Sequence, residues 1–141
     1  MKLAPLSLLI ALGALTGAAN AGCNRPTTPG DPPDGARAAR EEMVSAFKTV
    51  AQYNEQMTVY LDCLKADHET ALKARQKEGD TLKSTEQREY HARDVETFRK
   101  EFATTHDRAY EELLAVVARF NKEKDEFNQR VKKEKDAQGG Q

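Results

Sequence analysis

The sequence has no tryptophan and only two cysteines, and all of its five prolines lie within the first 33 residues. Because no proline follows Pro33, the remaining chain can form long uninterrupted helices. It also has no nucleophile elbow, phosphate loop, zinc-ligand spacing or catalytic triad. A chain without these patterns is not expected to be an enzyme, and we predict no cofactor and no metal site.

The charge is nearly balanced, with a formal net charge of −1, which argues against nucleic acid or an anionic membrane as a main partner. Charged residues make up 32% of the chain and hydrophobic residues only 38%. This composition favours a narrow apolar seam over a large globular core.

Residues 1–21 have the features of a signal peptide. Lys2 is followed by the apolar stretch Leu3–Leu15, which is shorter than the roughly 20 residues that span a membrane. Ala19-Asn20-Ala21 is a small-x-small cleavage site. We therefore expect a mature chain that begins at Gly22, lacks a transmembrane segment, and lies in the periplasm of a Gram-negative-type bacterium or is secreted.

Cys23 lies where a bacterial lipoprotein would carry its acylated cysteine, so a lipid anchor there is an alternative. Against it, Asn20 occupies the position three places earlier, where such signals usually have leucine or a similar apolar residue. Residues 22–35 that follow the cleavage site are rich in proline and glycine. This segment is predicted to be extended and partly polyproline-like.

Residues 36–136 are predicted to form a helical hairpin. Apolar residues recur at steps of three, four or seven over about residues 37–78 and again over about residues 85–135, which is the pattern of one helical face. Residues 137–141 are expected to be a disordered tail.

Capping residues mark the ends of these helices. Asp34 can cap the first helix. Ser84 with Gln87 resembles a capping box at the start of the second. Thr104 and Thr105 could break the second helix, but the apolar pattern keeps its phase and favours a continuous one.

Two long helices joined by a short turn run antiparallel. The fold class is therefore all-α, a long antiparallel two-helix hairpin with coiled-coil-like packing. A turn centred near residue 81 places Leu61 opposite Phe102 and Phe47 near Val116. Such a hairpin is thin, and it needs a covalent tie or a partner.

The lengths of the tail and the first helix suggest how Cys23 and Cys63 could supply that tie. From Ala36, both Cys63 along the helix and Cys23 along an extended tail lie about 40 Å away. A disulfide between them would hold a taut tail against the first helix, as a thin third layer. An intermolecular bridge and lipidation of Cys23 remain alternatives.

Tyr53 and Tyr60 lie seven residues apart and follow one edge of the first helix. They are candidates for packing against the tail or for a partner surface. None of the three histidines has the Glu-x-x-His spacing of di-iron bundles. For His91 we expect a solvated pair with Asp94, and for His106 a polar position beside the seam.

The stretch Met43–Leu64, with Tyr60-Leu61-Asp62-Cys63-Leu64, resembles a group of small, uncharacterised, exported proteins of proteobacteria, as does Ala118-Arg119-Phe120-Asn121. The resemblance implies the hairpin and the cysteine pairing but no activity.

Leu82–Gln87 is similar to the Leu-Thr-x-x-Gln turn of envelope-stress periplasmic chaperones. We expect a non-enzymatic structural or interaction module of the cell envelope that binds a second copy or another envelope protein. A holdase-like chaperone is the alternative.

Overall fold

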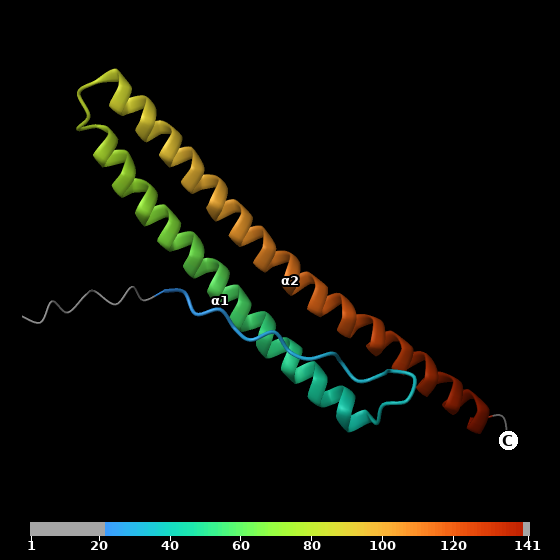
Figure 1. The fold of residues 1–141 in the computed structure, drawn as a ribbon. Helices are drawn as coiled ribbons and strands as arrows, with labels where there is room; N and C mark the ends of the chain where they lie inside the picture. The colour runs from blue at the N-terminus through green and yellow to red at the C-terminus, as the bar shows by residue number, and fades with distance from the viewer. Residues whose placement is uncertain (1–21, 140–141) are drawn as a thin grey trace, which may run out of the picture.

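Two antiparallel helices form the whole framework of the computed structural model, which describes residues 22–139. Helix α1 spans Arg40–Gly79 and helix α2 spans Thr85–Gly139. The extended segment Gly22–Ala39, called the tail below, runs back along the hairpin from the start of α1 (Figure 1). The predicted all-α hairpin with a tail tied back by a disulfide is confirmed. The predicted signal peptide, residues 1–21, lies outside the described residues.

Helix α1 begins at Arg40 and not near residue 37. The N–H groups of Arg37 and Ala38 donate to the carbonyl oxygen of Asp34 at 3.0 and 2.7 Å and close a separate turn. The Asp34 carboxylate accepts from the N–H of Ala36 in this turn, so the prediction that it caps α1 is wrong. At the true start of α1, the Glu42 carboxylate accepts from the N–H of Ala39 at 2.7 Å.

Helix α2 starts with the predicted capping box. The N–H of Gln87 donates to the Ser84 hydroxyl at 3.1 Å, and the Gln87 side chain accepts from the N–H of Ser84 at 3.4 Å. The helix runs through Thr104 and Thr105 without a break and ends at Gly139. Residues 137–139 are therefore helical, contrary to the predicted disordered tail, because no helix-breaking residue precedes Gly139.

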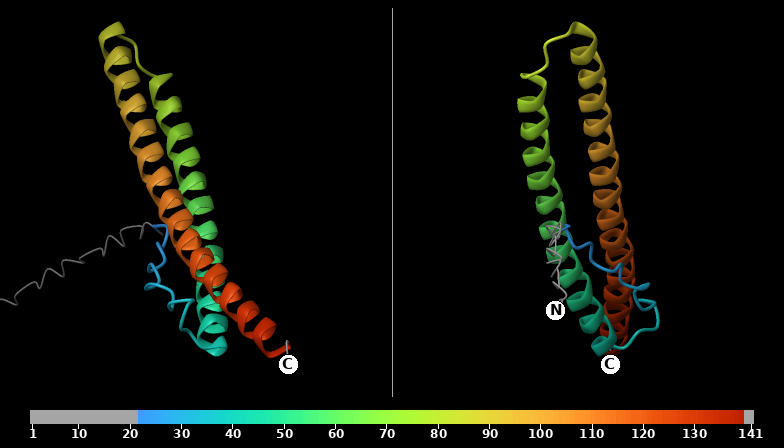
Figure 2. Two further views of the ribbon diagram at one scale, coloured as in Figure 1. Left: turned by 90° about the vertical axis from the view of Figure 1, so that its right-hand side faces the viewer. Right: turned by 60° about the vertical axis from the view of Figure 1, so that its left-hand side comes forward.

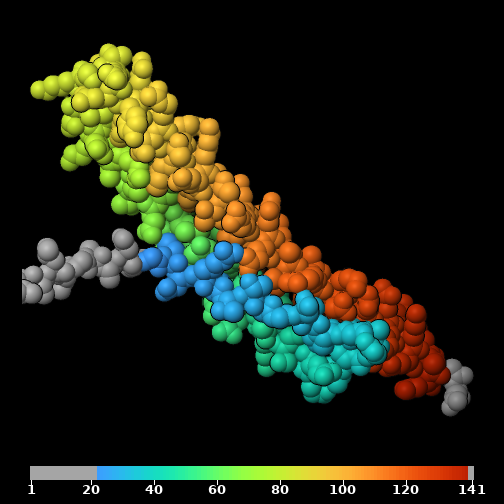
Figure 3. Space-filling model, viewed as in Figure 1, coloured from blue at the N-terminus to red at the C-terminus, as the bar shows by residue number. Residues whose placement is uncertain are grey.

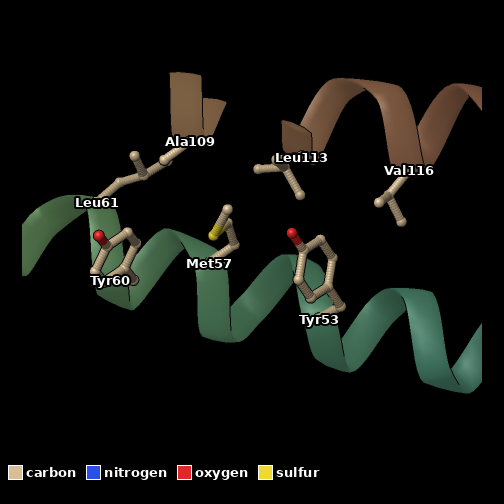
Figure 4. Packing of buried hydrophobic residues seen from close by; sticks show 7 residues of the cluster. All are labelled: Tyr53, Met57, Tyr60, Leu61, Ala109, Leu113 and Val116. Atoms are coloured by element: carbon tan, nitrogen blue, oxygen red, sulfur yellow. The ribbon is translucent and has the colours of Figure 1, made fainter. Parts of the chain in front are cut away.

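The core is a single apolar seam between the helices, and Met57, fully buried, lies at its centre. Figure 4 shows side chains of α1 and α2 meeting there, with Leu61 beside Ala109 and Tyr53 facing Leu113 and Val116. A second, smaller cluster of Ala38, Met43 and Phe120 closes the seam near the start of α1.

The expected register of the two helices is wrong by one to two turns. Phe47 packs on Phe120 with ring centroids 6.1 Å apart, and Phe102 stacks on His68 and not opposite Leu61. The connecting residues 80–84 run along the hairpin axis, away from the end of α1, before α2 begins. The start of α2 therefore extends past the end of α1 (Figure 2). Each α1 residue consequently faces a position further along α2 than a symmetric turn would give.

Candidate binding groove

The tail lies in the groove on one flank of the two helices, as the space-filling view shows (Figure 3). Its far end is fixed by a disulfide between Cys23 and Cys63, whose Cα atoms are 5.7 Å apart. The Sγ atom of Cys23 is also 3.2 Å from Oδ2 of Asp67. Since this sulfur is oxidised it has no proton to donate, so the contact places a carboxylate beside the disulfide without a hydrogen bond.

The Glu112 carboxylate of α2 joins the tail to both helices. It accepts hydrogen bonds from the Arg25 guanidinium and the Thr28 hydroxyl of the tail, and from the Tyr53 hydroxyl of α1 at 3.0 Å. The Thr28 hydroxyl contributes most to a lowered pKa of Glu112, and Tyr53 and Arg25 add to it. Burial raises the pKa of Tyr53, and the carboxylate it donates to raises it further. An ionised Glu112 and a protonated Tyr53 therefore favour the arrangement in which the tail is bound to both helices.

Three further α2 residues continue this series toward the start of α1. Arg119 pairs with Asp31 at 2.9 Å, the Glu123 carboxylate accepts from the N–H of Gly35 at 2.9 Å, and the Arg130 guanidinium donates to the carbonyl of Ala38 at 2.6 Å. With Glu112 they are spaced by seven, four and seven residues, so they share one side of α2. These four residues were not among the predicted site residues, although their helical spacing beside the apolar seam can be read from the sequence.

Both predicted tyrosines lie in the seam and not on an open surface. Tyr53 is 3% exposed and Tyr60 is 8% exposed, and the half-buried Cys23 packs against their cluster. The Tyr53 hydroxyl also reaches the tail indirectly, since it shares Glu112 with Arg25 and Thr28. With so little exposed area, neither ring offers a partner surface in this structure.

Beyond the disulfide, toward the turn, aromatic rings fill the space between the helices. The His68 ring stacks between Phe98 and Phe102, with centroid distances of 4.8 and 3.9 Å. The Arg75 guanidinium lies 3.8 Å from the centroid of the Phe98 ring, a distance at which the π system of the ring attracts a cation. His106 tilts against Phe102 at 5.6 Å, beside the seam.

His91 does not form the solvated pair with Asp94 that its spacing suggested. Its Nε2 donates to the carbonyl oxygen of Arg75 at 2.8 Å, while Asp94 pairs with the Arg75 side chain at 3.6 Å. The ring also packs close to Gly79, the last residue of α1. His91 therefore joins the start of α2 to the last turns of α1 through a side-chain hydrogen bond and through contact with Gly79.

The flank of the hairpin on which the tail lies also holds an open cavity of about 310 Å³, between the disulfide and the turn. We call this cavity the upper groove. Its lining begins at Leu64, directly after Cys63, and its floor is apolar and aromatic while exposed polar groups form its rim. Its lining residues are Leu64, Asp67, His68, Ala71, Phe98, Glu101, Phe102 and Thr105. The cavity arises only from the actual register of the helices, so the sequence pattern does not predict it.

Two clusters of described residues bring three ligand-type groups within 4.8 Å of one another: Cys23, Cys63 and Asp67, and Asp34, Glu123 and Glu126. In the first cluster both sulfurs are consumed by the disulfide. In the second, Glu123 accepts from the N–H of Gly35, and both glutamates pair with Lys122. Neither cluster offers three uncommitted metal ligands.

Comparison with protein-family models, curated proteins and solved structures finds no match to this chain. The resemblance to exported proteobacterial proteins therefore stays a prediction. Neither α1 nor α2 has a stretch apolar and long enough to cross a bilayer. The case for a function rests on the geometry of the groove.

Proposed function

We propose that the protein is an exported, non-enzymatic interaction module of the bacterial cell envelope that binds a partner polypeptide in its upper groove. The main support for this proposal is that the protein's own tail covers the groove between α1 and α2 only from the start of α1 to the disulfide. The same groove continues, open, past the disulfide with an apolar floor and an acidic rim.

Two further features support this proposal. A structural disulfide is typical of exported proteins, which agrees with the predicted signal peptide. Ligand sites are commonly mostly apolar with a few placed polar groups, and the upper groove has that composition. The disulfide and the tail stiffen the hairpin beneath the groove, so a partner would meet a preformed surface.

Site-specific photocrosslinking in the native host tests the proposal. A benzoylphenylalanine at Thr105, on the rim, should give a discrete adduct of defined mass with an envelope protein. The control is the same residue at Thr58, which is exposed on α1 and about 140° around the helix from Cys63. Equal adducts from both positions, or none from Thr105, would contradict the proposal. The holdase alternative predicts instead a smear of many clients from both positions.

A further inference from the structure

The upper groove continues the path that the tail already follows. The disulfide fixes tail residue Cys23 at Cys63, and the lining of the upper groove begins at the next residue of α1, Leu64. On α2, Glu101 of the rim and Glu112 of the tail contact are eleven residues apart, which is three turns and nearly the same angular position. One continuous groove therefore has an occupied half and an open half.

The open half has room for a short extended segment. From Leu64 to Ala71 along α1 is about 10 Å, which is the length of about three residues of extended chain. The floor offers the rings of His68, Phe98 and Phe102 for apolar contact. The Nδ1 atom of His68 is buried and has no hydrogen-bond partner in the structure, so an occupant would reach it only if the His68 ring turned.

The rim of the open half is acidic. Asp67 and Glu101 are both exposed, and within residues 22–139 neither forms a salt bridge, whereas Glu112 in the occupied half binds Arg25 of the tail. One ring of the floor, Phe98, already makes a cation–π contact with the guanidinium of Arg75, which lies outside the groove lining. The chemistry that complements the groove is thus a cationic side chain next to apolar ones.

We infer that the upper groove binds an extended segment of a partner protein that carries arginine or lysine beside apolar residues. This inference rests on the proposed function and names its partner class. The segment would continue the tail's line along the hairpin, with its cation between Asp67 and Glu101 and its apolar side chains on Phe98 and Phe102. The occupied half supplies the precedent for the ion pair, since Arg25 of the tail pairs there with Glu112.

Fluorescence anisotropy with the mature, oxidised protein tests the inference. The probe is a fluorescein-labelled peptide, Leu-Arg-Pro-Leu-Arg-Pro, in which proline favours an extended chain. One control peptide has glutamate in place of both arginines, and another has alanine in place of both leucines. We expect the probe to bind with a Kd on the order of 10–100 µM, and each control to bind at least about 10-fold more weakly.

Matched variants locate the binding. Thr105→Arg places a guanidinium on the rim within reach of Glu101 one turn earlier, and should weaken probe binding at least about 10-fold. Thr104→Arg makes the same change one position away, outside the groove lining, and should leave binding unchanged. Glu101→Gln should weaken binding about 2- to 5-fold, as expected for an exposed ion pair. Circular dichroism confirms that each variant is folded.

Equal binding of the arginine and glutamate peptides, no binding of the probe, or equal effects of Thr105→Arg and Thr104→Arg would overturn the inference. Sedimentation showing a dimer that Thr105→Arg dissociates would also overturn it, because a second copy would then fill the groove. A crosslinked adduct at Thr105 combined with a peptide that does not bind would refute the partner class alone. Absence of the adduct would refute the proposed function itself.

Discussion

Replacing Gly35 with alanine should separate the tail from α2 at the base of the hairpin. Gly35 packs directly on the α2 backbone, and an added Cβ would lie 1.8 Å from the carbonyl oxygen of Glu123 and 2.9 Å from the nitrogen of Phe127. Contacts of a Cβ below 3.0 Å essentially do not occur. Because the opposing atoms belong to a helix backbone, rotation of a side chain cannot relieve the clash.

The cost of Gly35→Ala can be estimated from this geometry. Extra atoms in a close-packed contact cost about 1–3 kcal/mol, and we expect the upper end because backbone must move by more than an ångström. The movement also breaks the hydrogen bond from the N–H of Gly35 to Glu123. A loss of about 3 kcal/mol should lower the melting temperature by about 10 °C or more.

Gly30 supplies the matched control, since a Cβ there meets nothing within 4 Å and its φ is not positive. Gly30→Ala should therefore be neutral or stabilise by up to about 1 kcal/mol, through the lower entropy of the unfolded chain. Urea unfolding of both variants, followed by far-UV circular dichroism with the disulfide intact, gives the difference. If the two variants differ by less than about 0.5 kcal/mol, Gly35 is not in the contact described here.

Three other predictions concern the tail and the turn. Reducing the disulfide, or replacing both cysteines with serine, should cost about 4 kcal/mol in the chain-entropy model for a 40-residue separation, measured by urea unfolding; a loss below about 1 kcal/mol would contradict a structural role. The lowered pKa of Glu112 means that its stabilisation is present above pH 4.5 and is lost as pH falls through the folded-state pKa, so Glu112→Gln should flatten the acid limb of a stability-against-pH curve. An unchanged acid limb would refute that assignment. Ser84→Ala should cost about 1 kcal/mol by removing the cap of α2, and a change of m-value instead of midpoint would point to a different cause.

The sequence predicted the helices and the tail well because each depends on local chemistry. Apolar residues at helical spacing, the Ser84–Gln87 capping box and the absence of proline after Pro33 are all short-range properties. The disulfide followed from matching two lengths that start at Ala36. Such arguments need no knowledge of how side chains pack.

The register and the upper groove depend on packing, and here the sequence was insufficient. The turn length alone suggested that Leu61 faces Phe102, but the connection climbs along the axis, and Phe102 stacks on His68 instead. The contacts of Glu112 with Arg25 and Thr28 likewise need the tail's exact path. Asp34 illustrates the same limit, because its carboxylate is satisfied within a turn that the cap pattern did not reveal.

The occupied half of the groove explains why the tail carries a covalent tie. Exposed ion pairs such as Arg119 with Asp31 contribute about 0–1 kcal/mol each, whereas fixing each backbone residue costs about 1–2 kcal/mol. Polar contacts alone would therefore not hold the tail, and the disulfide supplies the missing stability. A partner segment in the upper groove has no such tie. It should bind weakly as a free peptide, and a stable complex would need further contacts along α1 or α2 that raise the effective concentration of that segment.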